Sequence, residues 1–190
     1  MKTPEPSATI GELVLRPEDL TIQRAARLLL LLEVAAPVEL KRPLDVERLS
    51  YCDFFAANPF ALFDNGSPEA NDLLLAGFSS FDLSYQSSGH RYVTRRHRLQ
   101  ADLSFLLSRG LVRAVAVARR VAYESSEDGI RLSERLNSLY AQSYRRSAAH
   151  VLRRLDRLTD TALAKESRDR LESTGQLIDL YGSSGKEMSE

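Results

Sequence analysis

The chain has little cysteine and no long apolar run. Cys52 is the single cysteine among 190 residues, so the chain can form no internal disulfide and no multi-thiolate metal site. The strongest apolar run, residues 28–32, is five residues long, whereas a membrane-spanning helix needs roughly 18. The first 19 residues carry prolines and acidic side chains, which fit neither a secretory signal nor a transit peptide. We therefore expect a cytoplasmic protein without a membrane span.

Motifs of catalysis are also missing. The chain contains no glycine-rich dinucleotide fingerprint, no His-Glu-x-x-His and no nucleophile elbow. Cys52 falls on the apolar side of its predicted helix, as a buried small hydrophobe does. His90 and His97 lack the carboxylate or thiolate neighbours of a metal site. We expect no catalytic residue, no cofactor and no metal, and hence no enzyme.

The net charge of zero conceals a segregation of charge along the chain. Residues 1–89 hold 7 basic and 13 acidic side chains, residues 90–157 hold 15 and 6, and residues 158–190 hold 4 and 7. The middle block therefore carries a net charge of +9. This asymmetry indicates an anionic partner, either nucleic acid or an acidic protein surface, although acidic segments of the same chain can also neutralise the block.

The basic block begins with a predicted helix and a β-hairpin. Residues 91–109 carry leucines at helical spacing with Thr94 as the candidate N-cap, and Gly110 follows where a left-handed residue ends a helix. Residues 112–123 are rich in β-branched side chains and alanine, which predicts two short strands joined at Arg119-Arg120. The order predicts a recognition-type helix followed by a wing.

Helices are predicted on both sides of this unit, the longest over residues 126–158. The fold class is therefore mainly α (α+β), with a winged-helix core, a short β-hairpin wing and long C-terminal helices. A capping box at Ser125 would start the longest helix, whose length suggests an arm for a partner. The other predicted helices cover residues 18–34, 46–57 with Asp45 as N-cap, 68–75 with Ser67 as N-cap, and 160–181. The predicted divisions are a flexible arm at 1–19, a winged-helix-like domain at 20–124, a helical extension at 125–181 and a frayed tail at 182–190.

Three sets of side chains are candidates for contact with a partner. The candidates for DNA or an acidic partner are Arg91, Arg95, Arg98, Arg109, Arg113, Arg119 and Arg120. A second basic stripe comprises Arg146, His150, Arg153 and Arg157, and the candidate partner-helix face comprises Leu136, Leu139, Tyr140, Val151 and Leu155. Both basic sets also fit ordinary solvated faces, and the apolar face also fits packing within the chain. Asp102 lies on the same flank of the predicted helix as Arg91, Arg95, Arg98 and Arg109 and is expected to pair with Arg98 or Arg95, which weakens the DNA interpretation.

Three segments, residues 27–62, 97–115 and 123–148, together resemble a known family. The first contains a Leu-x-x-x-Asp-Phe kernel at Leu49, Asp53 and Phe54 that ends at Asn58-Pro59, the second closes in Gly-Leu-Val, and the third is a Tyr-led strand entering a helix. The order resembles the middle component of bacterial ABC-three-component systems, which include the small subunit of Lamassu-type defence complexes. The chain departs from the usual Thr-x-x-Gly where it reads Ser-Glu-Asp-Gly at residues 126–129, which leaves the start of the long helix open.

The resemblance implies a non-catalytic subunit. Such a subunit lies between an SMC-like ABC ATPase and an effector, often a nuclease, in a complex that senses phage or plasmid DNA. Double-stranded DNA would then be a further partner. The alternative is a winged-helix transcription regulator that dimerises through its long C-terminal helices and reads DNA with residues 91–109.

Overall fold

The computed structural model describes residues 20–79 and 88–183, with side chains as far as Glu172. The helices are α1 (Thr21–Ala35), α2 (Val46–Ala57), the 3-10 turn η2 (Pro59–Ala61), α3 (Pro68–Leu75), α4 (Ser88–Ser108), α5 (Glu127–Glu134), α6 (Leu139–Leu155) and α7 (Asp160–Ser183). The strands are β1 (Val112–Val117) and β2 (Arg120–Ser125), which pair antiparallel. The mainly helical class with a small hairpin is confirmed. The predicted arm at 1–19 lies outside the described residues.

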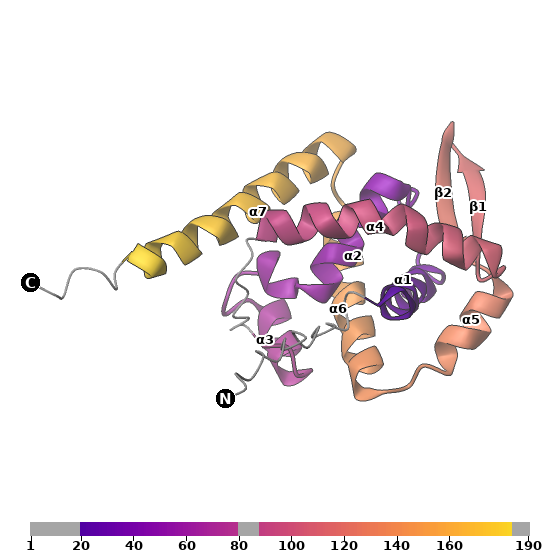
Figure 1. Cartoon of the computed structure of the whole chain (residues 1–190), viewed down its shortest axis with the longest axis horizontal. Helices are drawn as coiled ribbons and strands as arrows, with labels where there is room; N and C mark the ends of the chain where they lie inside the picture. The colour runs from indigo at the N-terminus through magenta and orange to yellow at the C-terminus, as the bar shows by residue number, and fades with distance from the viewer. Residues whose placement is uncertain (1–19, 80–87, 184–190) are drawn as a thin grey trace, which may run out of the picture.

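Helix α1 forms the centre of the structure. Its leucines from Leu28 to Leu32 are each at most 2% exposed because α2, α4, α5 and α6 all contact this helix. Figure 1 shows α1 end-on, with α4, α5 and α6 around it. The leucine run therefore serves the core.

Short polar residues start three of the predicted helices. Asp45 accepts a hydrogen bond from the Arg48 N–H at 2.9 Å, and Ser67 accepts one from the Ala70 N–H at 3.1 Å. Thr159 accepts one from the Ala162 N–H at 3.2 Å and so begins α7. Each bond satisfies an amide that has no partner inside its own helix, and the predicted boundaries at these caps are confirmed.

Helix α4 begins earlier than predicted. It starts at Ser88, so the expectation that Thr94 is its N-cap was wrong. Tertiary packing holds the added turns: the Tyr92 ring stacks on Tyr51 at a centroid distance of 5.1 Å, and its hydroxyl shares a hydrogen bond of 2.9 Å with Ser50. At the other end the prediction is confirmed, because Gly110 has a φ of +67°.

The hairpin turn lies one residue before its predicted place. Ala118 and Arg119 both have positive φ, at 47° and 67°, as a type I′ turn requires. Arg120 is the first residue of β2 and pairs with Val117. The prediction of an Arg119-Arg120 turn was therefore wrong by one position. The twist of the two strands determines which residues form the turn, and the polarity of the side chains does not.

The predicted long helix over residues 126–158 is wrong. The segment forms two helices, α5 and α6, because Ser138 caps α6 by accepting a hydrogen bond from the Ala141 N–H at 3.2 Å. Arg145 donates to the carbonyls of Leu136 and Ser133 at 2.8 and 2.6 Å, which satisfies the end of α5. The cap of α5 is Ser126 instead of Ser125. Because no helix spans residues 126–158, the argument from helix length for a partner-binding arm does not hold.

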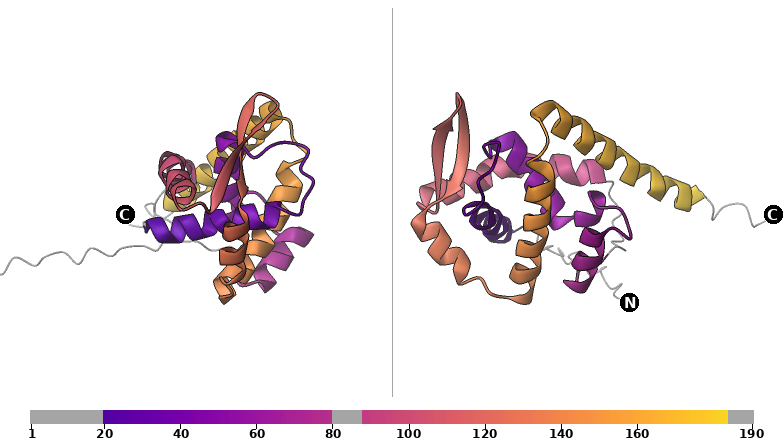
Figure 2. Two further views of the ribbon diagram at one scale, coloured as in Figure 1. Left: turned by 90° about the vertical axis from the view of Figure 1, so that its right-hand side faces the viewer. Right: turned by 180° about the vertical axis from the view of Figure 1, so that it is seen from behind.

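Helix α7 is the element that extends from the body of the molecule. Its first turns pack through Leu163 and Leu171, which are 2% and 8% exposed, and it contacts α4 and η2. Beyond those contacts the backbone runs outward, as Figures 1 and 2 show. It ends at Ser183, two residues past the predicted boundary.

Candidate functional site

The middle of the predicted basic flank is an internal ion pair. Arg95 of α4 holds both carboxylate oxygens of Asp53 through Nε and Nη2, and the Tyr144 hydroxyl donates to the same carboxylate at 3.2 Å. The side chains of Arg95 and Asp53 are 13% and 7% exposed. Burial lowers the pKa of the guanidinium, but the charge and hydrogen bonds of Asp53 outweigh it and raise that pKa above its usual value. Arg95 thus joins α4 to α2 and α6.

Asp102 has a different partner from the one expected. It accepts two hydrogen bonds from Arg24 of α1, at 2.8 and 3.0 Å, and both side chains are buried. The expectation that Asp102 pairs with Arg98 or Arg95 was therefore wrong. Arg24 and Asp102 are 78 residues apart, so no local sequence pattern predicts the pair.

Arg27, one helical turn after Arg24, is buried without such a carboxylate. Its Nε and Nη2 atoms are buried and have no hydrogen-bond partner among the described residues, and its residue exposure is 9%. Arg24 and Arg95 use this same Nε and Nη2 edge to hold their carboxylates. Burial raises the pKa of nearby Tyr144 well above its usual value, and the positive charge of Arg27 opposes part of that rise. A buried cation without a counter-ion destabilises the fold.

Replacing Arg27 with methionine is therefore expected to raise the free energy of unfolding by about 1–3 kcal/mol, because an apolar side chain of similar length removes the buried charge. Urea denaturation followed by circular dichroism measures the change. The matched control is Arg24→Met, one turn earlier, which should destabilise the protein because Asp102 is left buried and unpaired. A loss of stability in Arg27→Met would contradict the expectation.

The other predicted residues of α4 lie in different surroundings. Arg91 donates to the side chain of Asn58, the residue that ends α2. Arg98 is half-buried, and the exposed Arg109 places its guanidinium over the Phe105 ring at 5.2 Å from the centroid. The structure therefore divides the flank into internal contacts near its start and an exposed cation at its end.

The hairpin arginines also separate into paired and unpaired side chains. Arg113 pairs with Glu124 across the strands at 2.9 Å, where both are exposed. Arg120 pairs with Asp45 at 3.2 Å and with Asp160 at 2.6 Å. Arg119 lies exposed in the turn and forms no ion pair within the described part of the chain.

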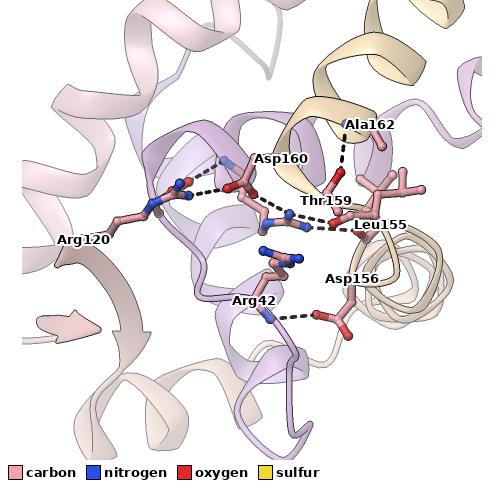
Figure 3. Close-up of polar contacts among 10 residues, drawn as sticks. Arg42, Arg120, Leu155, Asp156, Thr159, Asp160 and Ala162 are labelled. Carbon is pink, nitrogen blue, oxygen red and sulfur yellow. Dashed lines mark hydrogen bonds and ion pairs between the residues drawn. The ribbon is translucent and has the colours of Figure 1, made fainter. Parts of the chain in front are cut away.

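A polar cluster at the base of the hairpin joins four elements, and sequence reasoning missed it. The buried Arg48 of α2 donates to the carbonyls of Leu155 and Leu158, at 2.9 and 3.0 Å, and to Asp160 at 2.8 Å. Figure 3 shows this cluster, with Arg120 reaching Asp160 from the hairpin. Hydrogen bonds from Arg48 and then Arg120 lower the pKa of Asp160. The cluster fixes the start of α7 against α2, the end of α6 and β2.

The second basic stripe divides in the same way. His150 and Arg146 both contact Asp72 of α3, at 2.8 and 3.3 Å. The hydrogen bond with His150 lowers the pKa of Asp72. Arg153 and Arg157 are exposed and form no ion pair with any residue that the structure describes. The first half of the stripe therefore holds α6 against α3.

The residues of the predicted partner-helix face do not form one exposed surface. Val151 and Leu155 are 0% and 1% exposed in this chain's own core, so they are removed from the candidate face. Leu136 is half-buried, whereas Leu139 and Tyr140 are 79% and 50% exposed. The fold of α6 against α1 and α2 selects which apolar side chains remain outside.

Helix α3 adds apolar side chains beside the first turn of α6. The Ser143 hydroxyl donates to the Ala76 carbonyl at 2.6 Å, which places the end of α3 against α6. Leu74 and Leu75 of α3 are 46% and 86% exposed. These two leucines with Leu139 and Tyr140 are called the α3–α6 patch below. The sequence pattern placed α3 correctly, but it merged α6 into one long helix with α5 and did not show that α3 and α6 meet.

Comparison with known protein families decides the identity of the chain. The family model described as ABC-three component (ABC-3C) system Middle Component 2 matches residues 76–176, more than half of the chain. The protein belongs to this middle component family. No curated protein sequence and no solved structure matches it.

The family match covers α4, the hairpin, α5 and α6 and reaches into α7. It begins after α2, so the Leu-x-x-x-Asp-Phe kernel of α2 lies outside it. The middle component family predicted from the sequence is confirmed. The Asp53–Arg95 pair thus connects the matched region to the helices that precede it.

The described residues of this middle component offer no metal site. They contain no group of three or more His, Cys, Asp or Glu side chains placed to hold a metal ion. Within residues 20–79 and 88–183, no helix combines the length and the apolar character needed to cross a membrane. Cys52 is 1% exposed, and burial raises the pKa of its thiol to about 12, so it stays protonated at neutral pH.

Proposed function

We propose that this middle component is a non-catalytic accessory subunit that bridges an SMC-like ABC ATPase and an effector subunit, such as a nuclease. The complex would be a cytoplasmic bacterial defence complex of the Lamassu type, directed against phage or plasmid DNA. Membership in the ABC-three-component middle component family carries the proposal.

Two separate surfaces support a bridging role. The α3–α6 patch exposes large apolar side chains on adjoining turns, and such clusters commonly mark protein contacts. The hairpin is the other surface, and Figure 1 shows it at the opposite side of the molecule from α3. A subunit that joins two proteins needs two contact surfaces that do not overlap.

The double variant Leu75→Asp with Leu139→Asp is expected to weaken association with one partner at least about tenfold, because it places charge in the centre of an apolar contact. The measurement is co-purification of the co-expressed three-component complex, followed by biolayer interferometry with the captured component. Val38→Asp, at an exposed valine in the loop after α1, is the matched control. A chain that purifies without any ABC component would contradict the bridging role.

The alternative of a homodimeric winged-helix regulator receives less support. The helix through which it would dimerise is two helices, and Val151 and Leu155 lie in the core of one chain. The order of α4 followed by a hairpin is the remaining observation in favour of a winged helix. Arg109 and Arg119 are the cations through which double-stranded DNA would be reached, since Arg95 and Arg120 bind carboxylates of the chain itself.

A further inference from the structure

The two edges of the hairpin are not equivalent. A two-residue turn makes Val117 and Arg120 a hydrogen-bonded pair, so every second pair along the ladder points its backbone groups outward. On β1 the outward groups therefore belong to Val112, Ala114 and Ala116, and on β2 to Val121, Tyr123 and Ser125. The Tyr123 N–H donates to the Leu44 carbonyl at 3.0 Å, which agrees with this alternation.

The edge of β2 is covered by the chain itself. The Leu44 carbonyl binds the Tyr123 amide, and the Arg120 side chain is held by Asp45 and Asp160 on this side. Figure 1 shows β2 on the side of the hairpin nearer to α2 and α7. No further strand can pair along this edge without displacing those contacts.

The edge of β1 carries few of the features that usually protect a free edge. Its sequence, VRAVAV, has no proline and a single charge, and Ala114 and Ala116 are exposed. Neither residue's outward backbone groups bond to any described backbone atom. In Figures 1 and 2 the hairpin stands out from the helices, with β1 on its outer side. A strand could therefore approach β1 along most of its length.

The charges near this edge select the kind of strand. Arg109, Arg113 and Arg119 are exposed around β1, and Glu124, the partner of Arg113, is the one acid on the strands. A second copy of this chain would bring two basic hairpins together, and like charges on neighbouring strands destabilise a sheet. An incoming strand with carboxylates would instead be attracted.

We propose that the outer edge of β1 binds a β-strand from a partner subunit, in which apolar residues alternate with acidic ones. The inference rests on the proposed bridging function and specifies that one of the two subunit contacts is the addition of a strand to the hairpin. The backbone groups of Ala114 and Ala116 form the new ladder, and their small side chains leave room for larger side chains on the added strand. Arg113 and Arg119 pair with its carboxylates.

Hydrogen exchange of the Ala114 and Ala116 amides tests the inference directly. The full chain is compared with the three-component complex obtained by co-expression, and exchange at both amides should slow at least about tenfold in the complex, since each amide becomes hydrogen-bonded. A complex that assembles while both amides exchange as in the free chain would overturn the inference and leave the proposed function standing. Absence of any complex would overturn the proposed function as well.

A matched pair of proline variants provides the second measurement. Ala116 and Val121 are cross-strand neighbours whose amides point to opposite edges, so neither Ala116→Pro nor Val121→Pro removes a bond of the hairpin ladder. Thermal melting of each variant checks that the fold is retained. Ala116→Pro should weaken co-purification at least about tenfold relative to Val121→Pro, because only β1 accepts the partner strand. Equal effects of the two variants would contradict the inference.

Other occupants give distinguishable results. Protection of Ala114 and Ala116 that rises with the concentration of the isolated chain would indicate a second copy, and protection at every concentration would indicate a segment of the same chain. Protection of neither amide, combined with loss of duplex DNA binding in Arg119→Glu, would assign the hairpin to DNA. Each of these outcomes overturns the partner strand.

Discussion

Replacing Arg95 with methionine is expected to lower the free energy of unfolding by about 3–5 kcal/mol, because the change leaves the buried Asp53 without its cation. Arg95 supplies two of the hydrogen bonds to this carboxylate, and Tyr144 supplies a third at 3.2 Å. The remaining tyrosine bond cannot compensate a full negative charge between α2, α4 and α6. Guanidinium chloride denaturation measures the loss.

Two controls separate the buried pair from a general effect of losing an arginine. Arg96→Met removes the neighbouring arginine, whose pair with Glu47 is exposed at 50% and 48%, and should cost less than about 1 kcal/mol. The double variant Arg95→Met with Asp53→Leu removes both charges and should recover most of the loss. Equal losses in Arg95→Met and Arg96→Met would show that burial of the pair contributes nothing to stability.

Replacing Gly129 with alanine is expected to destabilise the protein by about 3 kcal/mol or more, because the added methyl group has no space. A Cβ at this position would lie 2.0 Å from the Leu111 carbonyl oxygen and 2.6 Å from the Ser125 hydroxyl. The carbonyl cannot retreat freely, since it accepts a hydrogen bond from the Ser126 N–H at 3.0 Å. Thermal unfolding should show a large decrease in Tm with the hairpin and α5 displaced.

Gly89→Ala is the matched control for this substitution. Gly89 is also helical, in the first turn of α4, and a Cβ there meets nothing within 4 Å. Alanine is the better helix former, so this variant should be neutral or more stable by up to about 1 kcal/mol. A Tm for Gly129→Ala equal to that of the unchanged protein would mean that α5 does not approach the strands as closely as described.

Local chemistry explains which predictions from the sequence succeeded. Asp45, Ser67 and Thr159 each satisfy an amide within three residues of themselves, so the cap and its helix lie in one short segment. The left-handed Gly110 and the alternating small and β-branched residues of the hairpin also act over a few positions. Elements of this kind are determined by neighbours in the chain.

The prediction of one long helix over residues 126–158 was wrong because local periodicity does not reveal a reversal of the chain. Apolar residues continue at helical spacing across residues 135–138, and periodicity alone does not show that the chain reverses there. The bonds from Arg145 to the carbonyls of Ser133 and Leu136 and to Glu33 of α1 form only once α6 folds back. The capping serine, Ser138, was present in the sequence but lay among other polar residues.

Tertiary packing determines which candidate contact residues are internal and which are exposed, and their spacing along the sequence does not. Arg95 and Arg119 are both arginines of one basic block, yet one is an internal partner of Asp53 and the other is exposed in a turn. Asp53 and Arg95 are 42 residues apart, so nothing near either residue reveals the pair. The α3–α6 patch likewise exists only because α6 packs against α3, through Ser143 and through the contacts of His150 and Arg146 with Asp72.

The sequence by itself determined the helical class, the starts of α2, α3 and α7, the position of the hairpin and the family to which the chain belongs, because these depend on short-range caps, turns and apolar periodicity. The tertiary structure alone decided which arginines neutralise acids inside the molecule and which apolar side chains stay outside. It also decided that one edge of the hairpin is closed by Leu44 while the other remains open. The reason is that charge pairing and burial depend on distance in space, and the partners concerned lie tens of residues apart along the chain.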